Sequence, residues 1–280
     1  MTETAFPVLA AALIVGLCIG SFLNVVVHRL PKMLERAWRE DCAEHGGQEV
    51  AAAQPYNLVV PRSACPSCGH QITALENIPV ASWLALHGRC SACKTRISAR
   101  YPIVEILGGL LAVAAIATFG ANATGVAACL FLWTLLALAL IDADTQYLPD
   151  DITLPLLWAG LIVNLFGLFT PLPSAVIGAV AGYLSLWTVY WLFKLIRGKE
   201  GMGYGDFKLL AALGAWLGWK MLPLVILLSS VAGAVIGLAL IAFRGRDHTT
   251  PLPFGPYLAI AGAIALFFGP ALVRIWLPHG

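Results

Sequence analysis

Two aspartates stand at the ends of apolar runs of this chain. Asp142 directly follows one run, and Asp206 lies between the glycines of segment 201–206 and another run. Charges in or beside hydrocarbon are costly, so acids at such positions are functional candidates. If the fold brings the two carboxyl groups together, the ionised one can activate a water molecule while the protonated one polarises a carbonyl group. The pair therefore predicts an aspartyl hydrolase.

Three glycines precede Asp206, at Gly201, Gly203 and Gly205. Because glycine has no side chain, an extended peptide backbone could approach the acid closely. A G-x-G-D match alone has low specificity. The sequence contains no G-x-S-x-G and no H-E-x-x-H motif, which argues against a serine or a zinc hydrolase.

Three further acids follow the first candidate. Asp150 and Asp151 come just after Pro149, at the start of an expected helix near residue 152, where acids favour the positive end of the helix dipole. Asp144 is intermediate between the two classes. We therefore predict that the pair is Asp142 with Asp206, and that the other three acids cap helices or face solvent.

Four cysteines form two C-x2-C pairs separated by 21 residues: Cys65, Cys68, Cys90 and Cys93. Two such knuckles can close a tetrahedral four-thiolate site, and a reducing compartment favours metal over disulfide. The sequence predicts a structural zinc ion held by these four residues. A redox pair or unrelated thiols are the alternatives. His70 and His87 lie nearby and are expected to be solvated.

The composition indicates a membrane protein, because 59% of residues are hydrophobic and 11% are charged. Eight apolar runs are candidate spans: 6–27, 102–119, 124–141, 152–169, 174–195, 207–219, 221–243 and 254–273. The fold class is therefore an all-α polytopic membrane protein with about eight transmembrane helices. Run 207–219 is the weakest candidate, because at about 1.5 Å per residue it covers only about 20 Å of a hydrocarbon core of about 30 Å.

Basic residues set the expected orientation. Of 17 lysines and arginines, 15 fall in the loops 28–101, 142–151, 194–208 and 244–253. The positive-inside rule places these loops in the cytoplasm and both termini on the periplasmic side. Both candidate aspartates then lie at the cytoplasmic side. The basic excess is a topology signal and does not indicate nucleic acid.

The expected organisation has three parts. A first transmembrane helix spans 1–27, a cytoplasmic loop domain with the cysteine knuckles spans 28–101, and a seven-helix membrane domain with the aspartates spans 102–280. Within the loop, residues 33–54 predict a short charged helix that is solvated or lies on the membrane surface.

Four blocks of sequence together resemble the prepilin peptidase family, the bifunctional leader peptidases and N-methyltransferases of type IV pili and type II secretion. The blocks are residues 20–31, the C-x2-C stretch with 76–79 and 97–105, residues 141–150, and residues 203–209 with 253–257. They span nearly the whole chain in family order. The family's eight spans and its large first cytoplasmic loop agree with the eight runs.

The resemblance implies that the two catalytic aspartates of this G-x-G-D peptidase family are Asp142 and Asp206. It implies a prepilin or pseudopilin substrate, with a short basic leader and a glycine before the cut, in the bacterial inner membrane. It also implies N-methylation of the new N-terminal residue with S-adenosylmethionine, tied to the cysteine-bearing loop. No Rossmann glycine fingerprint marks residues for the methyl donor.

Three other functions remain open at this point. One is a transporter or channel whose acids bind a proton or cation, although no acid lies at mid-span and no inverted repeat is visible. Another is a zinc-bearing membrane scaffold with structural aspartates. The third is a peptidase of the same fold that cleaves a different substrate.

Overall fold

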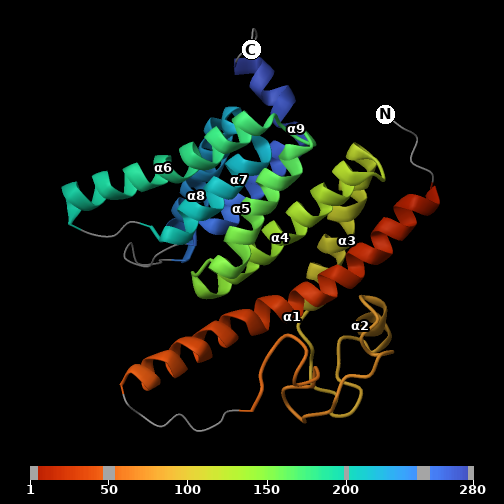
Figure 1. The fold of residues 1–280 in the computed structure, drawn as a ribbon. Coiled ribbons are helices and arrows are strands. Elements are labelled where there is room, and N and C mark those ends of the chain that lie inside the picture. The colour runs from red at the N-terminus through yellow and green to blue at the C-terminus, as the bar shows by residue number, and fades with distance from the viewer. Residues whose placement is uncertain (1–5, 47–53, 199–201, 245–252, 277–280) are drawn as a thin grey trace. The chain divides into compact units, whose positions relative to one another are not determined.

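The computed structural model describes residues 6–46, 54–198, 202–244 and 253–276, and these form helices joined by loops (Figure 1). The helices are α1 (Phe6–His45), α2 (Ala81–Ala85), α3 (Arg100–Phe119), α4 (Ala123–Thr145), α5 (Asp150–Leu165), α6 (Leu172–Arg197), α7 (Tyr204–Leu217), the 3-10 turn η1 (Trp219–Met221), α8 (Leu222–Arg244) and α9 (Gly255–Trp276). In the described ranges, β pairing is confined to two isolated bridges, both in the loop between α1 and α3.

The chain divides into two compact units, residues 1–129 and 130–280. Helix α4 crosses the boundary between them. The cysteine knuckles belong to the first unit, whereas both candidate aspartates belong to the second. Each candidate site is therefore built within one unit.

Each of the eight apolar runs corresponds to one helix, although runs 152–169 and 207–219 extend past the ends of α5 and α7, and this confirms the all-α membrane fold. Six helices of the described chain are long and apolar enough to cross a membrane. The two shorter ones are α5, with 16 residues, and α7, with 14 residues. The expected number of eight spans is therefore approximate, and the protein is a multi-pass membrane protein.

Helix α1 does not end where its apolar run ends. It continues for 40 residues to His45, with Pro31 inside it. The charged residues after 33 thus extend α1 up to His45 and do not form the separate short helix that we expected. Residues 47–53 of that segment lie outside the described residues. Beyond Pro31, the extension contains neither glycine nor proline before position 46 to interrupt it.

Small residues let α1 and α3 pack closely in the first unit. A Cβ atom added at Gly16 would lie 2.6 Å from the backbone oxygen of Gly108, and one at Gly20 would lie 2.6 Å from the Cα atom of Glu105. Gly16 and Gly20 form a G-x-x-x-G pattern, which lets helix backbones approach each other in a membrane. The glycine that opens the first family block, Gly20, therefore serves helix packing.

Helix α7 is the central helix of the second unit, in contact with α5, α6, α8 and α9. Ten of its 14 residues are buried, from Asp206 to Trp216. At its far end, the Asn164 amide donates to the carbonyl oxygens of Ala215 and Trp216 at 2.8 and 3.0 Å. The short length of α7 follows from this position, because a helix enclosed by other helices need not match the thickness of the bilayer.

Candidate active site and metal centre

The structure brings Asp142 and Asp206 into one site of the second unit. Asp142 lies in the last turn of α4 and Asp206 lies in the first turn of α7, and their exposed fractions are 5% and 7%. Asp142 lies close enough to Asp206 for the charges of the two carboxyl groups to interact. An aspartyl dyad requires two buried carboxyl groups whose charges interact.

A third segment contacts Asp142 from the start of α9. The backbone N–H of Gly255, the first residue of α9, donates to Asp142 Oδ2 at 2.9 Å. Asp206 lies in the first turn of α7, and the Asp142 carboxylate at the end of α4 meets the first N–H of α9. The N-termini of α7 and α9 carry the positive part of the helix dipole. Gly255 belongs to the last family block, but sequence reasoning gave it no role. The signal available was its P-F-G-P-Y context, which places a helix start beside a glycine.

The other acids of this region take the places expected for them. Asp150 and Asp151 lie in the first turn of α5. In addition, Asp150 forms an ion pair with Lys208 of α7, with oxygen–nitrogen distances of 2.6 and 2.7 Å. Asp144 is exposed on α4, in contrast to the buried Asp142. This difference in burial favours Asp142 as the member of the pair.

The glycines before Asp206 have different surroundings. A Cβ atom on Gly205 would lie 2.7 Å from the Cβ atom of Leu148, so this position is filled by the turn between α4 and α5. At Gly203 the nearest atom would be 4.0 Å away, so space remains open there. Gly201 lies outside the described residues. Gly205 therefore serves the packing of the site, whereas Gly203 keeps the open approach that the sequence suggested.

The contact between Gly205 and Leu148 predicts a defect that a second substitution can reverse. Gly205→Ala should push the Leu148 turn away from α7 and reduce the peptidase rate expected of the aspartate pair by about 10- to 100-fold, because displacement of about 1 Å at a catalytic group can cost that much. Adding Leu148→Gly removes the clashing Cβ atom and should recover much of the rate. Steady-state cleavage of a prepilin peptide by the two single variants and the double variant measures this. A double variant no faster than Gly205→Ala would contradict the packing argument.

The four cysteines form one cluster in the first unit, with all four sulfur atoms within 4.8 Å of one another. The Cys65 and Cys93 sulfurs are 3.8 Å apart, and those of Cys68 and Cys90 are 4.0 Å apart. Four sulfurs at about 2.3 Å from a tetrahedral zinc ion are separated by about 3.8 Å. The donor set and its spacing therefore fit zinc, and these distances are far longer than a disulfide bond.

The two knuckles have the same backbone geometry. Gly69 and Lys94, each just after the second cysteine of a pair, have φ angles of 73° and 60°. Their backbone N–H groups donate to the carbonyl oxygens of Cys65 and Cys90 at 2.9 and 3.1 Å. A bridge between flanking residues closes each knuckle. This left-handed turn aims both thiols of a pair at one point.

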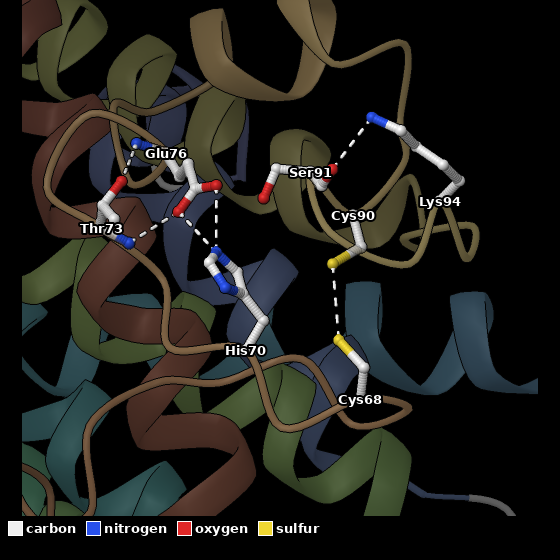
Figure 2. A network of polar contacts seen from close by, with 7 residues as sticks. All are labelled: Cys68, His70, Thr73, Glu76, Cys90, Ser91 and Lys94. Atoms are coloured by element: carbon white, nitrogen blue, oxygen red, sulfur yellow. Dashed lines mark hydrogen bonds and ion pairs between the residues drawn. The ribbon is translucent and has the colours of Figure 1, made fainter.

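A set of polar contacts around Glu76 lies beside Cys68 and Cys90 (Figure 2). The Glu76 carboxylate accepts the Thr73 N–H at 2.8 Å and lies 3.3 Å from the His70 ring. Hydrogen bonds from the Ser91 hydroxyl, then from Thr73, lower the pKa of Glu76 to about 2. His70 is therefore a partner of Glu76 and not a fifth ligand of the cluster, and His87 is exposed.

Thr95 forms hydrogen bonds with Cys93, one of the four clustered cysteines. Its side-chain and backbone hydrogen bonds lower the pKa of the Cys93 thiol to about 6. Because the thiolate is the form that binds metal, this contact favours a metal-binding state of the cluster.

Two buried charges fix the cysteine-bearing loop to the helices of its unit. Arg29 of α1 donates to the backbone oxygen of Asn57 at 2.9 Å. Glu105 of α3 accepts the N–H of Val80 at 2.7 Å. The exposed fraction of each charged residue is 8%. The charged residues of the first two family blocks thus attach the loop to the membrane helices.

Comparison with known proteins places both units in one group. The chain matches the model of the bacterial peptidase A24 N-terminal domain over residues 14–119 and that of the type IV leader peptidase family over residues 129–238. The second match contains both aspartates, and the first contains all four cysteines. No solved structure matches the chain significantly.

Curated relatives are similar over nearly their whole length. A protein of Aeromonas hydrophila is 58% identical over 266 residues, which are 94% of this chain and 92% of the relative. A Pseudomonas aeruginosa protein is 58% identical over 95% of this chain and 92% of its own length, and one of Pseudomonas putida is 59% identical over 92% and 90%. All three carry the name prepilin leader peptidase/N-methyltransferase.

Proposed function

The chain belongs to the type IV leader peptidase family, and from that premise we propose that Asp142 and Asp206 are the catalytic aspartates with which it removes the leader of prepilins or pseudopilins. It is an enzyme with both protease and methyltransferase activity. The observation that carries the proposal is the pair of buried, interacting carboxyl groups, one at the end of α4 against the first N–H of α9 and the other in the first turn of α7.

The chemistry follows from the two carboxyl groups. The ionised one takes a proton from water, and the water oxygen attacks the scissile carbonyl carbon while the protonated one gives its proton to the carbonyl oxygen. Collapse of the tetrahedral intermediate breaks the C–N bond, and the leaving nitrogen takes a proton from the pair. The products are a leader with a new carboxylate and a mature protein with a new amino terminus. The Asp150–Lys208 ion pair holds α5 and α7 together beside this reaction.

The position of the basic residues supports a cut on the cytoplasmic side of the bacterial inner membrane, with both termini periplasmic. A basic leader would remain in the cytoplasm, and the hydrophobic helix after it would lie in the membrane. The same argument divides the chain into an anchoring helix 1–27, a cytoplasmic loop 28–101 and a membrane domain 102–280. Lipid and prepilin are the partners in this scheme.

The second reaction joins a methyl group to the new amine. S-adenosylmethionine supplies that methyl group when bound, and a polar donor of this kind reaches the enzyme from the cytoplasm. A cavity of about 700 Å³ lies between the second half of α1 and residues 54–61, with Arg36, Glu40 and Tyr56 on its walls. Its charged and aromatic walls make it a candidate place for the donor among the described residues. Zinc held by the four cysteines would keep this loop folded.

A separation of the two reactions tests this assignment. Asp206→Asn should leave methyl transfer to a synthetic mature N-terminus within about two-fold of the normal rate, because the dyad takes part only in cleavage. The same variant should not cleave a full-length prepilin peptide. Transfer of radiolabelled methyl groups to the pre-cut peptide measures the first activity. Loss of transfer while S-adenosylmethionine still binds would mean that both reactions use one site.

Of the three other functions, the zinc-bearing scaffold would show no turnover, and the other two predict different results in the same assay. A peptidase with another substrate would leave a prepilin peptide intact but cleave a different membrane protein. A proton or cation transporter would cleave neither, and its activity would appear only as flux in sealed vesicles.

A further inference from the structure

The start of α9 directs a single backbone donor at Asp142. Pro256 has no N–H group, and the N–H groups of Tyr257 and Leu258 both donate to the Phe254 carbonyl oxygen at 3.1 and 3.2 Å. The N–H of Gly255 is therefore the one from residues 255–258 that points away from its own turn, and it reaches the carboxylate at 2.9 Å. The order of residues in P-F-G-P-Y-L thus isolates one donor for a partner outside the helix.

Position 255 requires glycine because a side chain would not fit there, and not because of its backbone conformation. Gly255 is absent from the positive-φ residues of the described chain, so alanine could adopt its backbone angles. A Cβ atom there would lie 2.7 Å from Asp142 Oδ2 and 3.1 Å from its Cγ atom. Asp142 is almost fully buried, so it has little room in which to move away. Any side chain at 255 would therefore displace the carboxylate.

We propose that Gly255 is a positioning residue for leader cleavage. Its N–H group fixes the Asp142 carboxylate, and its lack of a side chain leaves free the volume that this carboxylate occupies. The inference rests on the proposed dyad. A charged carboxylate is stabilised by a donated backbone N–H and by the positive end of a helix, and both come from the start of α9. A hydrogen bond between residues 113 positions apart also sets the relative placement of α4 and α9 at the site.

The first test is Gly255→Ala in the full-length enzyme in detergent. We expect kcat for cleavage of a prepilin peptide to fall by about 100-fold, with KM within about two-fold, because the carboxylate is misplaced without loss of the substrate surface. The matched control is Gly269→Ala in the same helix. A Cβ atom there would meet the flexible Met221 sulfur at 2.7 Å, so the side chain can shift and cleavage should remain normal.

The second test removes the N–H group without adding a Cβ atom. Glycolic acid incorporated at position 255 replaces the amide with an ester, and we expect cleavage to fall by about 10-fold. The acid limb of the pH–rate profile should also move, because the charged carboxylate has lost a donor. A reduced amount of folded enzyme would scale that profile without moving it. This variant decides the question if Gly255→Ala does not fold.

The outcomes separate this inference from the proposed function. If Asp142→Asn cleaves normally, the dyad itself is wrong. If Asp142→Asn is inactive but Gly255→Ala and the ester variant cleave like Gly269→Ala, the dyad stands and the positioning role of Gly255 is refuted. If both Gly255 variants lose rate as stated while methyl transfer to a pre-cut peptide is retained, the role is supported.

Discussion

Replacing either Asp142 or Asp206 by asparagine is expected to lower leader cleavage by at least about 1,000-fold, because each carboxyl group takes part in proton transfer to or from the reacting atoms. Asparagine has nearly the same shape and keeps an oxygen that can accept the Gly255 N–H, so the fold should persist. Cleavage of a prepilin peptide by purified variants in detergent measures the effect, with binding of the uncut peptide as the control for the substrate surface.

Asp144→Asn is the matched control for this experiment. It removes a carboxylate two residues further along α4, at an exposed position. We expect its cleavage rate to stay within about three-fold of the normal rate. If Asp144→Asn is inactive and Asp142→Asn is not, the burial argument has selected the wrong acid.

The sequence was sufficient to locate the helices and to bring the four cysteines into one cluster. Apolar runs identify the membrane helices because length and hydropathy act locally along the chain. The spacing of the four cysteines predicted one cluster because two short knuckles can fold independently of distant elements. The choice of Asp142 over Asp144 rested on its place directly after an apolar run, and this is the acid that the structure buries.

What the sequence left out depends on long-range packing. The contact between Gly255 and Asp142 joins segments that no local pattern relates. The role of Gly205 depends on Leu148, which lies 57 positions earlier in the chain. The length of α1 was underestimated because a change from apolar to charged residues marks the end of hydrocarbon and not the end of a helix. Burial of α7 likewise depends on neighbours that only the fold supplies.

Removing zinc is expected to damage methylation much more than cleavage. Structural zinc sites of this kind contribute about 10–16 kcal/mol to folding in isolated zinc-finger peptides, so the cysteine-bearing loop should lose its structure without the ion. The dyad belongs to the other unit and is held by contacts within it, including those of Gly255 and Lys208. Cleavage should therefore fall by no more than about 10-fold, while methyl transfer should fall by at least about 100-fold.

The experiment compares Cys90→Ser with Cys42→Ser in the full-length enzyme. Cys90 is a buried member of the cluster, whereas Cys42 is an exposed cysteine of α1 outside it. Metal analysis should give about one zinc ion per chain for the normal enzyme and for Cys42→Ser, and much less for Cys90→Ser. A metal-free Cys90→Ser protein that still resists proteolysis in its loop and still transfers methyl groups would show that the four thiols do not hold the loop together. Equal loss of both activities would instead mean that the loop supports the dyad as well, because the structural integrity of one unit would then be required for chemistry in the other.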